Sequence, residues 1–296
     1  MRIDYKLSDK FDFGIFIPVS ILIAIGLSAI YSSTFNHPTA SGNFERQLVW
    51  GVVAFIIFFI TYSLPTNIFR TIATMTAGDK GTTEYTKEEI GNMRQREAAE
   101  AVKLLDGSYS CLGLEDVYLM YDRESLNRTT SLIRKVKPSV VITASPNDYM
   151  VDHEMTSRIV QTACFAAGIK NMDCMESSVN FIPYLYYSDP MELKDIFGVR
   201  VNPDFFIDIS GVMKLKEQML GCHKSQRDWL LAHHKVDEYI LSMKHYAEIR
   251  GSEANTIYAE GFRQHLGHSF PQDNIIKDQL PELCIKNESL DLLKIR

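Results

Sequence analysis

The sequence predicts an α/β protein, with a Rossmann-like, mainly parallel sheet that has helices on both faces, preceded by a two-helix transmembrane hairpin. Two observations predict this fold class. Residues 1–69 contain two long uncharged apolar runs. Residues 70–296 alternate short β-branched runs with amphipathic segments, which is the order typical of a parallel sheet. The net charge of −6 argues against nucleic acid as a partner, because a surface that binds phosphates is basic.

The first 69 residues have the character of a membrane hairpin. The predicted spans are residues 13–35 and 47–66, and each is long enough to cross a bilayer. Arg2, Lys6 and Lys10 precede the first span and Arg70 follows the second. The positive-inside rule therefore places both termini, and the soluble domain, in the cytoplasm. Two alternatives stay open, a cleaved signal peptide for the first run and buried core helices for both.

The sequence pattern of residues 70–296 predicts a soluble domain in which strands alternate with helices. Thr86-Lys-Glu-Glu89 is a capping box, which marks the start of a helix. The other predicted helices are residues 125–136, one that ends near 167, and 225–250, which Gly251 is expected to stop. The predicted strands are a short one before the loop at residues 77–83, a weak one at 116–120, one at 138–143 covered on both faces, and 205–210.

The stretch PNDYMVDH after the strand at residues 138–143 is the candidate site. Asp148, Asp152 and His153 lie within six positions of one another, where ligand sites form in parallel sheets. Carboxylates and an imidazole can hold a metal or move a proton. The simpler alternative is structural, with Asp152 as the N-cap of the next helix and His153 as an ordinary residue of its first turn.

Several segments, in order, resemble the LmbE or PIG-L family of zinc-dependent N-deacetylases over residues 71–296. They are TMTAGDKGTT, MRQREAAEAVKLL, KPSVVITASPNDYMVDH, DISGVMKLKEQMLGCHKSQRDWL and YAEGFRQHLGHSFP. The resemblance implies a zinc hydrolase that removes N-acetyl groups from an amino sugar or glycoconjugate. It implies that His153 is a zinc ligand, that Asp152 orders its loop or supports it, and that Asp148 lines the same pocket. Glu260, Phe262 and Tyr184 would then contact the substrate.

The chain departs from the family at the first strand. That strand should end in His-Pro-Asp-Asp, which supplies two further zinc ligands and the general base, yet this sequence has no Asp-Asp pair. Its one His-Pro, His37-Pro38, lies in the hairpin loop. The resemblance therefore implies weakened zinc binding and impaired or absent hydrolysis. A missing first strand, central in such a sheet, would also leave its neighbours without backbone partners.

Residues 1–69 resemble another family, the RodA branch of the RodA/FtsW membrane glycosyltransferases, through IGLSAIYSST and FERQLVWG. The leading hypothesis is thus a RodA-like anchor, residues 1–69, joined to a truncated deacetylase domain, residues 70–296. One alternative is a membrane-tethered, non-enzymatic sugar-binding or scaffold module. The other is an unnatural fusion of two fragments, in which case a domain without a native hairpin would be cytoplasmic.

Overall fold

The computed structural model describes residues 13–34, 42–62, 70–227 and 238–287. The chain divides into two compact units, Met1–Pro65 and Thr66–Arg296. The predicted domain boundary, between residues 69 and 70, adjoins residues 63–69, which lie outside the described residues.

In the described residues of the first unit there are two helices, α1 (Phe13–Thr34) and α2 (Asn43–Tyr62). They pack through aromatic side chains: the ring of Phe16 lies 6.2 Å from that of Phe55 and 5.8 Å from that of Phe58. Of the helices in the described residues, only the segment Phe16–Thr34 of α1 is long and apolar enough to cross a membrane, a test that signal sequences and core helices also pass.

The second predicted span is therefore not supported. Glu45, Arg46 and Gln47 occupy the first turns of α2, so the apolar part of the helix within the described residues is short. Both helices nevertheless carry large apolar side chains that face outward, with Leu22 67% and Trp50 65% exposed.

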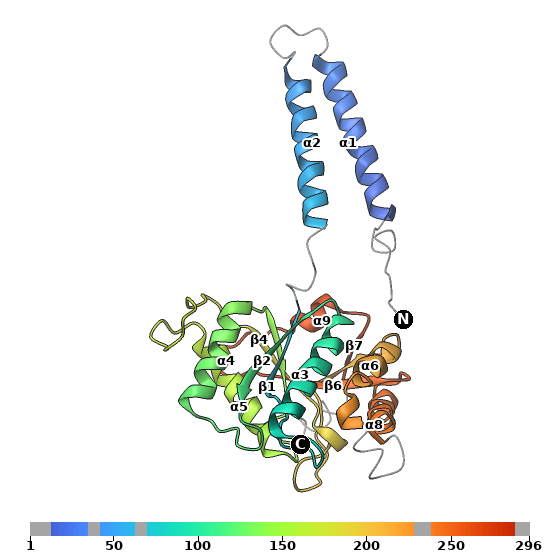
Figure 1. The fold of residues 1–296 in the computed structure, drawn as a ribbon. Coiled ribbons are helices and arrows are strands. Elements are labelled where there is room, and N and C mark those ends of the chain that lie inside the picture. The colour runs from blue at the N-terminus through green and yellow to red at the C-terminus, as the bar shows by residue number, and fades with distance from the viewer. Residues whose placement is uncertain (1–12, 35–41, 63–69, 228–237, 288–296) are drawn as a thin grey trace. The chain divides into compact units, whose positions relative to one another are not determined.

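The second unit is an α/β domain (Figure 1). Its strands are β1 (Thr71–Thr76), β2 (Ser108–Leu114), β3 (Val140–Thr143), β4 (Tyr184–Ser188), β5 (Phe205–Asp208), β6 (Ala259–Gln264) and β7 (Cys284–Lys286). Its helices are α3 (Lys87–Lys103), α4 (Arg123–Val136), α5 (Val151–Ala166), the 3₁₀ turn η3 (Met191–Leu193), α6 (Met213–Leu220), α8 (Glu238–Ala254) and α9 (Ile275–Gln279).

The strands form two sheets rather than one mainly parallel sheet. β1 and β2 pair in parallel, and a five-stranded sheet has the order β3-β4-β6-β5-β7. Only β3 and β4 are parallel there, whereas β6 runs antiparallel to β4 and β5, and β7 antiparallel to β5. The prediction of a mainly parallel sheet is thus wrong for β5, because a buried apolar run indicates that both faces are covered and says nothing about strand direction.

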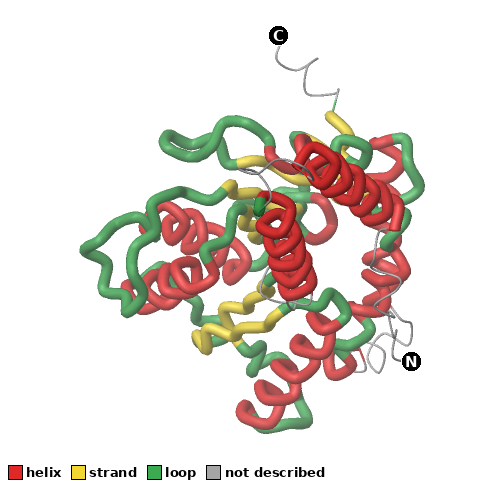
Figure 2. The backbone as a smooth tube through the Cα atoms, turned by 90° about the horizontal axis from the view of Figure 1, so that it is seen from above, coloured by secondary structure: helices red, strands yellow, loops and turns green. Residues whose placement is uncertain are grey.

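Helices cover both faces of the larger sheet. Leu185 of β4 packs with Ile133 of α4 and Val160 of α5 in one core cluster. The next residue, Tyr186, points to the opposite face, where Phe205 and Phe262 join it and α9 packs against them. Within the second unit, the tube view in Figure 2 shows helices on both sides of the strands. This part of the prediction is confirmed.

Local signals predicted the element boundaries unevenly. The capping box is present: Glu89 N donates to Thr86 Oγ1, and Thr86 N donates to the Glu89 carboxylate. The predicted strand at residues 116–120 is a loop, and the strand lies earlier, at β2, whose sequence SYSCLGL lacks a clear apolar alternation. Gly251 does not end its helix, since α8 continues to Ala254. Residues 228–237 of that predicted helix lie outside the described residues.

β1 and β3 each have a single strand partner among the described residues, β2 and β4 respectively. The expectation that a missing central strand leaves its neighbours without backbone partners concerns these two edges and stays a prediction. The strand predicted at residues 138–143 is not covered on both faces, because Ile142 is 54% exposed.

Candidate functional site

The candidate site lies where the parallel strands end. The loop after β3 leads into α5, and the loop after β2 meets it there, since Val117 N donates to Asp152 Oδ2 at 2.7 Å. Carboxyl ends of strands are where loops converge in open α/β sheets. The same edge therefore gathers the residues that the sequence analysis singled out after β3.

Asp148 and His153 form a hydrogen-bonded pair. Asp148 is 4% exposed, and its Oδ1 accepts from Met150 N at 3.1 Å and lies 2.9 Å from His153 Nδ1. The hydrogen bond to Asp148 raises the pKa of His153 above its usual 6.5, although burial opposes the shift. With Nδ1 held by the carboxylate, Nε2 is the ring nitrogen that can meet a ligand.

Asp152 turns away from this pair toward the loop after β2, through its bond with Val117 N. It is not the N-cap of α5, as the structural alternative proposed. The N-cap is Met150, which makes no side-chain cap hydrogen bond, and Asp152 lies inside the first turn. The contact with His153 belongs to Asp148, five residues earlier in the chain.

Ser145 organises the loop that carries Asp148. It is fully buried, and its Oγ donates to Asn147 O at 2.7 Å while it accepts from Asn147 N at 3.2 Å. Arg263 Nη2, on β6, also donates to Ser145 Oγ, at 2.8 Å. Burial lowers the pKa of Arg263.

Sequence reasoning missed Arg263 as a site residue. It lies 118 residues from Ser145 in the chain, so only the pairing of β6 with β4 brings the two together. The signal that could have found it is a basic residue beside the buried Phe262 in the strand AEGFRQ, where a charged side chain needs a partner.

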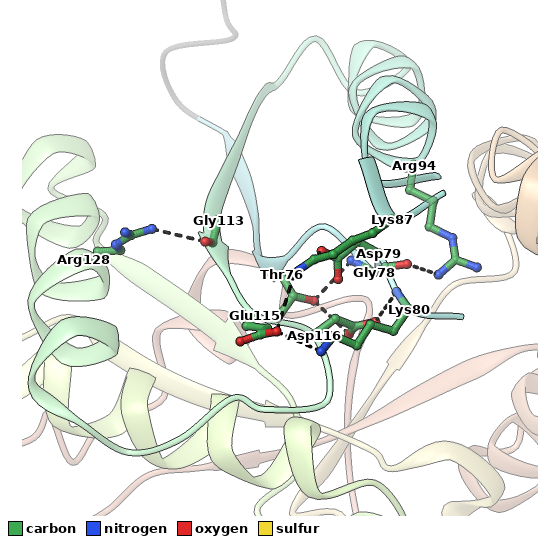
Figure 3. Close-up of polar contacts among 10 residues, drawn as sticks. All are labelled: Thr76, Gly78, Asp79, Lys80, Lys87, Arg94, Gly113, Glu115, Asp116 and Arg128. Carbon is green, nitrogen blue, oxygen red and sulfur yellow. Dashed lines mark hydrogen bonds and ion pairs between the residues drawn. The ribbon is translucent and has the colours of Figure 1, made fainter. Parts of the chain in front are cut away.

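A second polar cluster lies at the carboxyl ends of β1 and β2 (Figure 3). Thr76 Oγ1 donates to Asp116 Oδ1 at 3.2 Å, and Lys80 N donates to Asp116 Oδ2 at 3.2 Å. Lys80 Nζ pairs with Glu115 Oε1 at 2.8 Å. Arg94 of α3 donates to the carbonyls of Gly78 and Gly81, the latter at 2.7 Å. These bonds close the loop at residues 77–83, so the predicted turn there is fixed by side chains.

The remaining predicted site residues are not gathered at one place. Glu260 lies past the carboxyl end of β4, at the site's edge, and pairs with Lys216 of α6. Phe262 is 9% exposed and stacks on Phe205 in the core.

Tyr184 lies at the other end of β4. Val140 pairs with Tyr184 at the start of both strands, whereas Asp148 follows their carboxyl ends. The Tyr184 hydroxyl donates to Asp273 Oδ2 at 2.7 Å, which fixes it at that edge. Tyr184 therefore lies at the opposite end of β4 from the loop that carries Asp148 and His153, and its contact with a substrate stays a prediction.

A zinc site requires a defined number of protein side chains that bind the metal. Catalytic zinc sites take three protein ligands and one open position. In the described part of the chain, no group of three or more His, Cys, Asp or Glu side chains could hold a metal ion. His153 and Asp148 fit one ligand and the acceptor that orients it. The described residues therefore do not fit a complete catalytic zinc centre.

The sequence of the chain is similar to a known protein family and to individual known proteins. Residues 66–164 match the family described as "PIG-L: GlcNAc-PI de-N-acetylase". A diacetylchitobiose deacetylase from Thermococcus kodakarensis is 26% identical over 200 residues, which cover 64% of this chain and 69% of the relative. A 4-oxalmesaconate hydratase from Pseudomonas putida is 26% identical over 182 residues, which cover 61% of this chain and 69% of the relative.

A solved structure shows the same fold. The N,N'-diacetylchitobiose deacetylase from Pyrococcus horikoshii matches with a TM-score of 0.56 and 23% identity, and the match covers 70% of this chain and 77% of that one. Together the matches support a PIG-L-type domain within the second unit. Because one relative is a deacetylase and another a hydratase, the fold does not decide the reaction. The RodA resemblance of residues 1–69 is not shown by these matches.

Proposed function

We propose that residues 66–296 form an N-deacetylase-type domain whose reaction class is hydrolysis of the N-acyl amide of an amino sugar, and that this chain catalyses it slowly or not at all. The reaction class is supported by the match to a de-N-acetylase family and to a diacetylchitobiose deacetylase. The impairment is carried by one observation. The Asp148–His153 pair stands at the end of β3 without a third metal-capable side chain among the described residues.

The described residues provide part of what amide hydrolysis requires. Because His153 Nδ1 is bonded to Asp148, Nε2 is left for one of two roles. The neutral ring can bind a metal, whereas the protonated ring, which Asp148 stabilises, can donate a proton to a leaving amine. The reaction also needs an activated water and stabilisation of the developing oxyanion. No described side chain beside His153 fills these two roles, so we expect weak zinc binding and little turnover.

Purified full-length protein tests this proposal. The zinc content per chain and the hydrolysis of N,N'-diacetylchitobiose are measured for the wild type and for His153→Ala. We expect well below one zinc per chain and the same background turnover for both proteins. One tightly bound zinc per wild-type chain, with turnover that His153→Ala abolishes, would overturn the claim of impairment.

A sugar-binding module without chemistry is the second candidate. The incomplete set of metal-binding side chains favours it, because a protein can keep a binding pocket after it has lost its catalytic groups. It predicts saturable binding of an N-acetylglucosamine oligomer that neither a chelator nor His153→Ala changes. Binding that disappears with chelator would rule this candidate out.

We further propose that α1 anchors the chain in a membrane, with the second unit on the cytoplasmic side. The outward apolar side chains of α1 support this proposal. Whether residues 1–69 and 70–296 belong to one natural product is tested by sequencing the gene across codons 60–80. Two separate reading frames there would replace the anchored protein with two fragments.

A further inference from the structure

The open edges of β1 and β3 have the composition of interior strands. β1 reads TIATMT and β3 reads VVIT, and neither contains a charged residue or a proline. Natural edge strands are usually short, charged or interrupted, because an unpaired edge recruits other strands. The outer edge strand β7 follows that rule, since it has three residues and ends in Lys286. β1 and β3 do not.

Both strands also expose apolar side chains. Ile72 on β1 is 37% exposed and Ile142 on β3 is 54% exposed. Strands of a parallel sheet are normally buried on both faces. The exposure of these two isoleucines is therefore a cost that apolar side chains on an adjoining strand would reduce.

The two open edges belong to one core. Met75 of β1 and Val141 of β3 both pack against the cluster formed by α4, α5 and β4. Thr129 of α4 contacts Met75, with 3.7 Å between Oγ1 and Sδ. β2 takes the other edge of β1, and β4 takes the other edge of β3. The edges left unpaired in the described residues are thus those of neighbouring strands over a shared layer of helices.

The strand directions agree as well. The loop that follows β2 is hydrogen-bonded to the first turn of α5, which follows β3, through Val117 N and Asp152 Oδ2. The carboxyl ends of β2 and β3 therefore lie at the same end of the domain. Because β1 is parallel to β2, β1 and β3 also point the same way. An added strand of the same direction can therefore pair in parallel with either edge.

We propose that this position, between the open edges of β1 and β3, binds an extended apolar polypeptide segment of about four to six residues, supplied by a different protein rather than by a second copy of this chain. The length follows from β3 with four residues and β1 with six. A polypeptide source is supported by coverage: the matched region spans 69% of each curated relative and 77% of the solved deacetylase, so these relatives contain polypeptide that has no counterpart in the match. The binding does not depend on the proposed reaction.

Hydrogen exchange of the full-length protein in detergent tests the proposal. The probe is the peptide KKTVVIVITKK, and the control is the same peptide N-methylated at alternate central residues, which removes backbone donors. We expect the probe, but not the control, to slow amide exchange in Thr71–Thr76 and Val140–Thr143 at least tenfold. Ile72→Lys together with Ile142→Lys should weaken peptide binding at least tenfold, whereas Ile196→Lys, on an exposed loop, should leave it unchanged.

Three results would overturn the proposal. In the first, neither strand gains protection with the probe. In the second, protection appears at β2 or β7 instead, or equally with the methylated control. In the third, the same protection rises with protein concentration in the absence of peptide, which would assign the edges to a second copy of this chain. Since the readout is backbone exchange, none of these results depends on zinc or turnover.

Discussion

At the scale of single residues, the Asp148–His153 pair is the most informative contact of the candidate site. Both side chains were recognisable in the sequence, but their partnership was not, because Asp152 is the nearer carboxylate along the chain. The loop turns so that Asp148, buried and bonded to Met150 N, faces the imidazole. A spacing in sequence thus identifies the residues, and the loop conformation decides which of them interact.

The pair predicts a change in proton affinity. Asp148→Asn removes the largest cause of the raised pKa, so the pKa of His153 should fall. Asp152→Asn is the matched control, because Asp152 acts on His153 only through its charge and an amide oxygen can still accept from Val117 N. NMR titration of the His153 ring measures both values. Equal shifts in the two variants would contradict this assignment.

The same shift predicts how stability depends on pH. A raised histidine pKa in the folded state stabilises the fold fully below the unfolded value of 6.5, and the contribution disappears as pH rises through the folded pKa. The wild type should therefore have a higher free energy of unfolding than Asp148→Asn at low pH, and this difference should shrink as pH rises above about 6.5. Urea unfolding of both proteins across this range checks the direction.

At the scale of elements, the sequence predicted what is decided locally. The capping box before α3 and the β-branched run of β3 each lie within a few residues, and both form as expected. Strand pairing is decided elsewhere. The antiparallel position of β6 depends on contacts across about 80 residues, such as Tyr187 with Arg263, and no local pattern encodes them. For this reason Arg263 was missed while Asp148, Asp152 and His153 were found.

Gly251 illustrates how packing reverses a local rule. Gly-to-Ala changes inside helices usually stabilise by about 1 kcal/mol. Here a Cβ on Gly251 would lie 2.4 Å from Ile257 O and 2.9 Å from Thr256 O, both backbone atoms. The chain after α8 returns against the helix at this point, so only glycine leaves room for it.

Gly251→Ala should therefore destabilise the domain, by about 1–3 kcal/mol, the usual range for overpacking. The neighbouring exposed residue supplies the control, since Ser252→Ala should change stability by less than about 0.5 kcal/mol. Urea unfolding followed by circular dichroism measures both. An unchanged or increased stability of Gly251→Ala would show that the loop after α8 can move away at little cost.

At the scale of the whole molecule, the two units expose their apolar side chains to different extents. The second unit buries many apolar side chains in cores built by the two sheets and their helices, although others such as Ile142 and Phe197 are exposed. In α1, most of the large apolar side chains that the structure describes are exposed. A water-soluble protein rarely leaves such a surface uncovered. The apolar character of α1 was evident from the composition of residues 13–35. The shorter apolar part of α2 became evident only when the bounds of that helix were known.

If α1 spans a membrane, charge near its middle should prevent insertion. Leu22→Lys with Ile25→Lys replaces two exposed apolar residues, 67% and 60% exposed, near the centre of the helix. On the insertion scale the pair of changes costs on the order of 6–8 kcal/mol. The variant should leave the carbonate-resistant membrane fraction, whereas Ile196→Lys with Phe197→Lys, the same chemical change on an exposed loop of the second unit, should remain in it. A Leu22→Lys, Ile25→Lys protein that stays with the membrane would show that α1 is not what holds the chain there, and retention would then have to come from α2 or from the second unit.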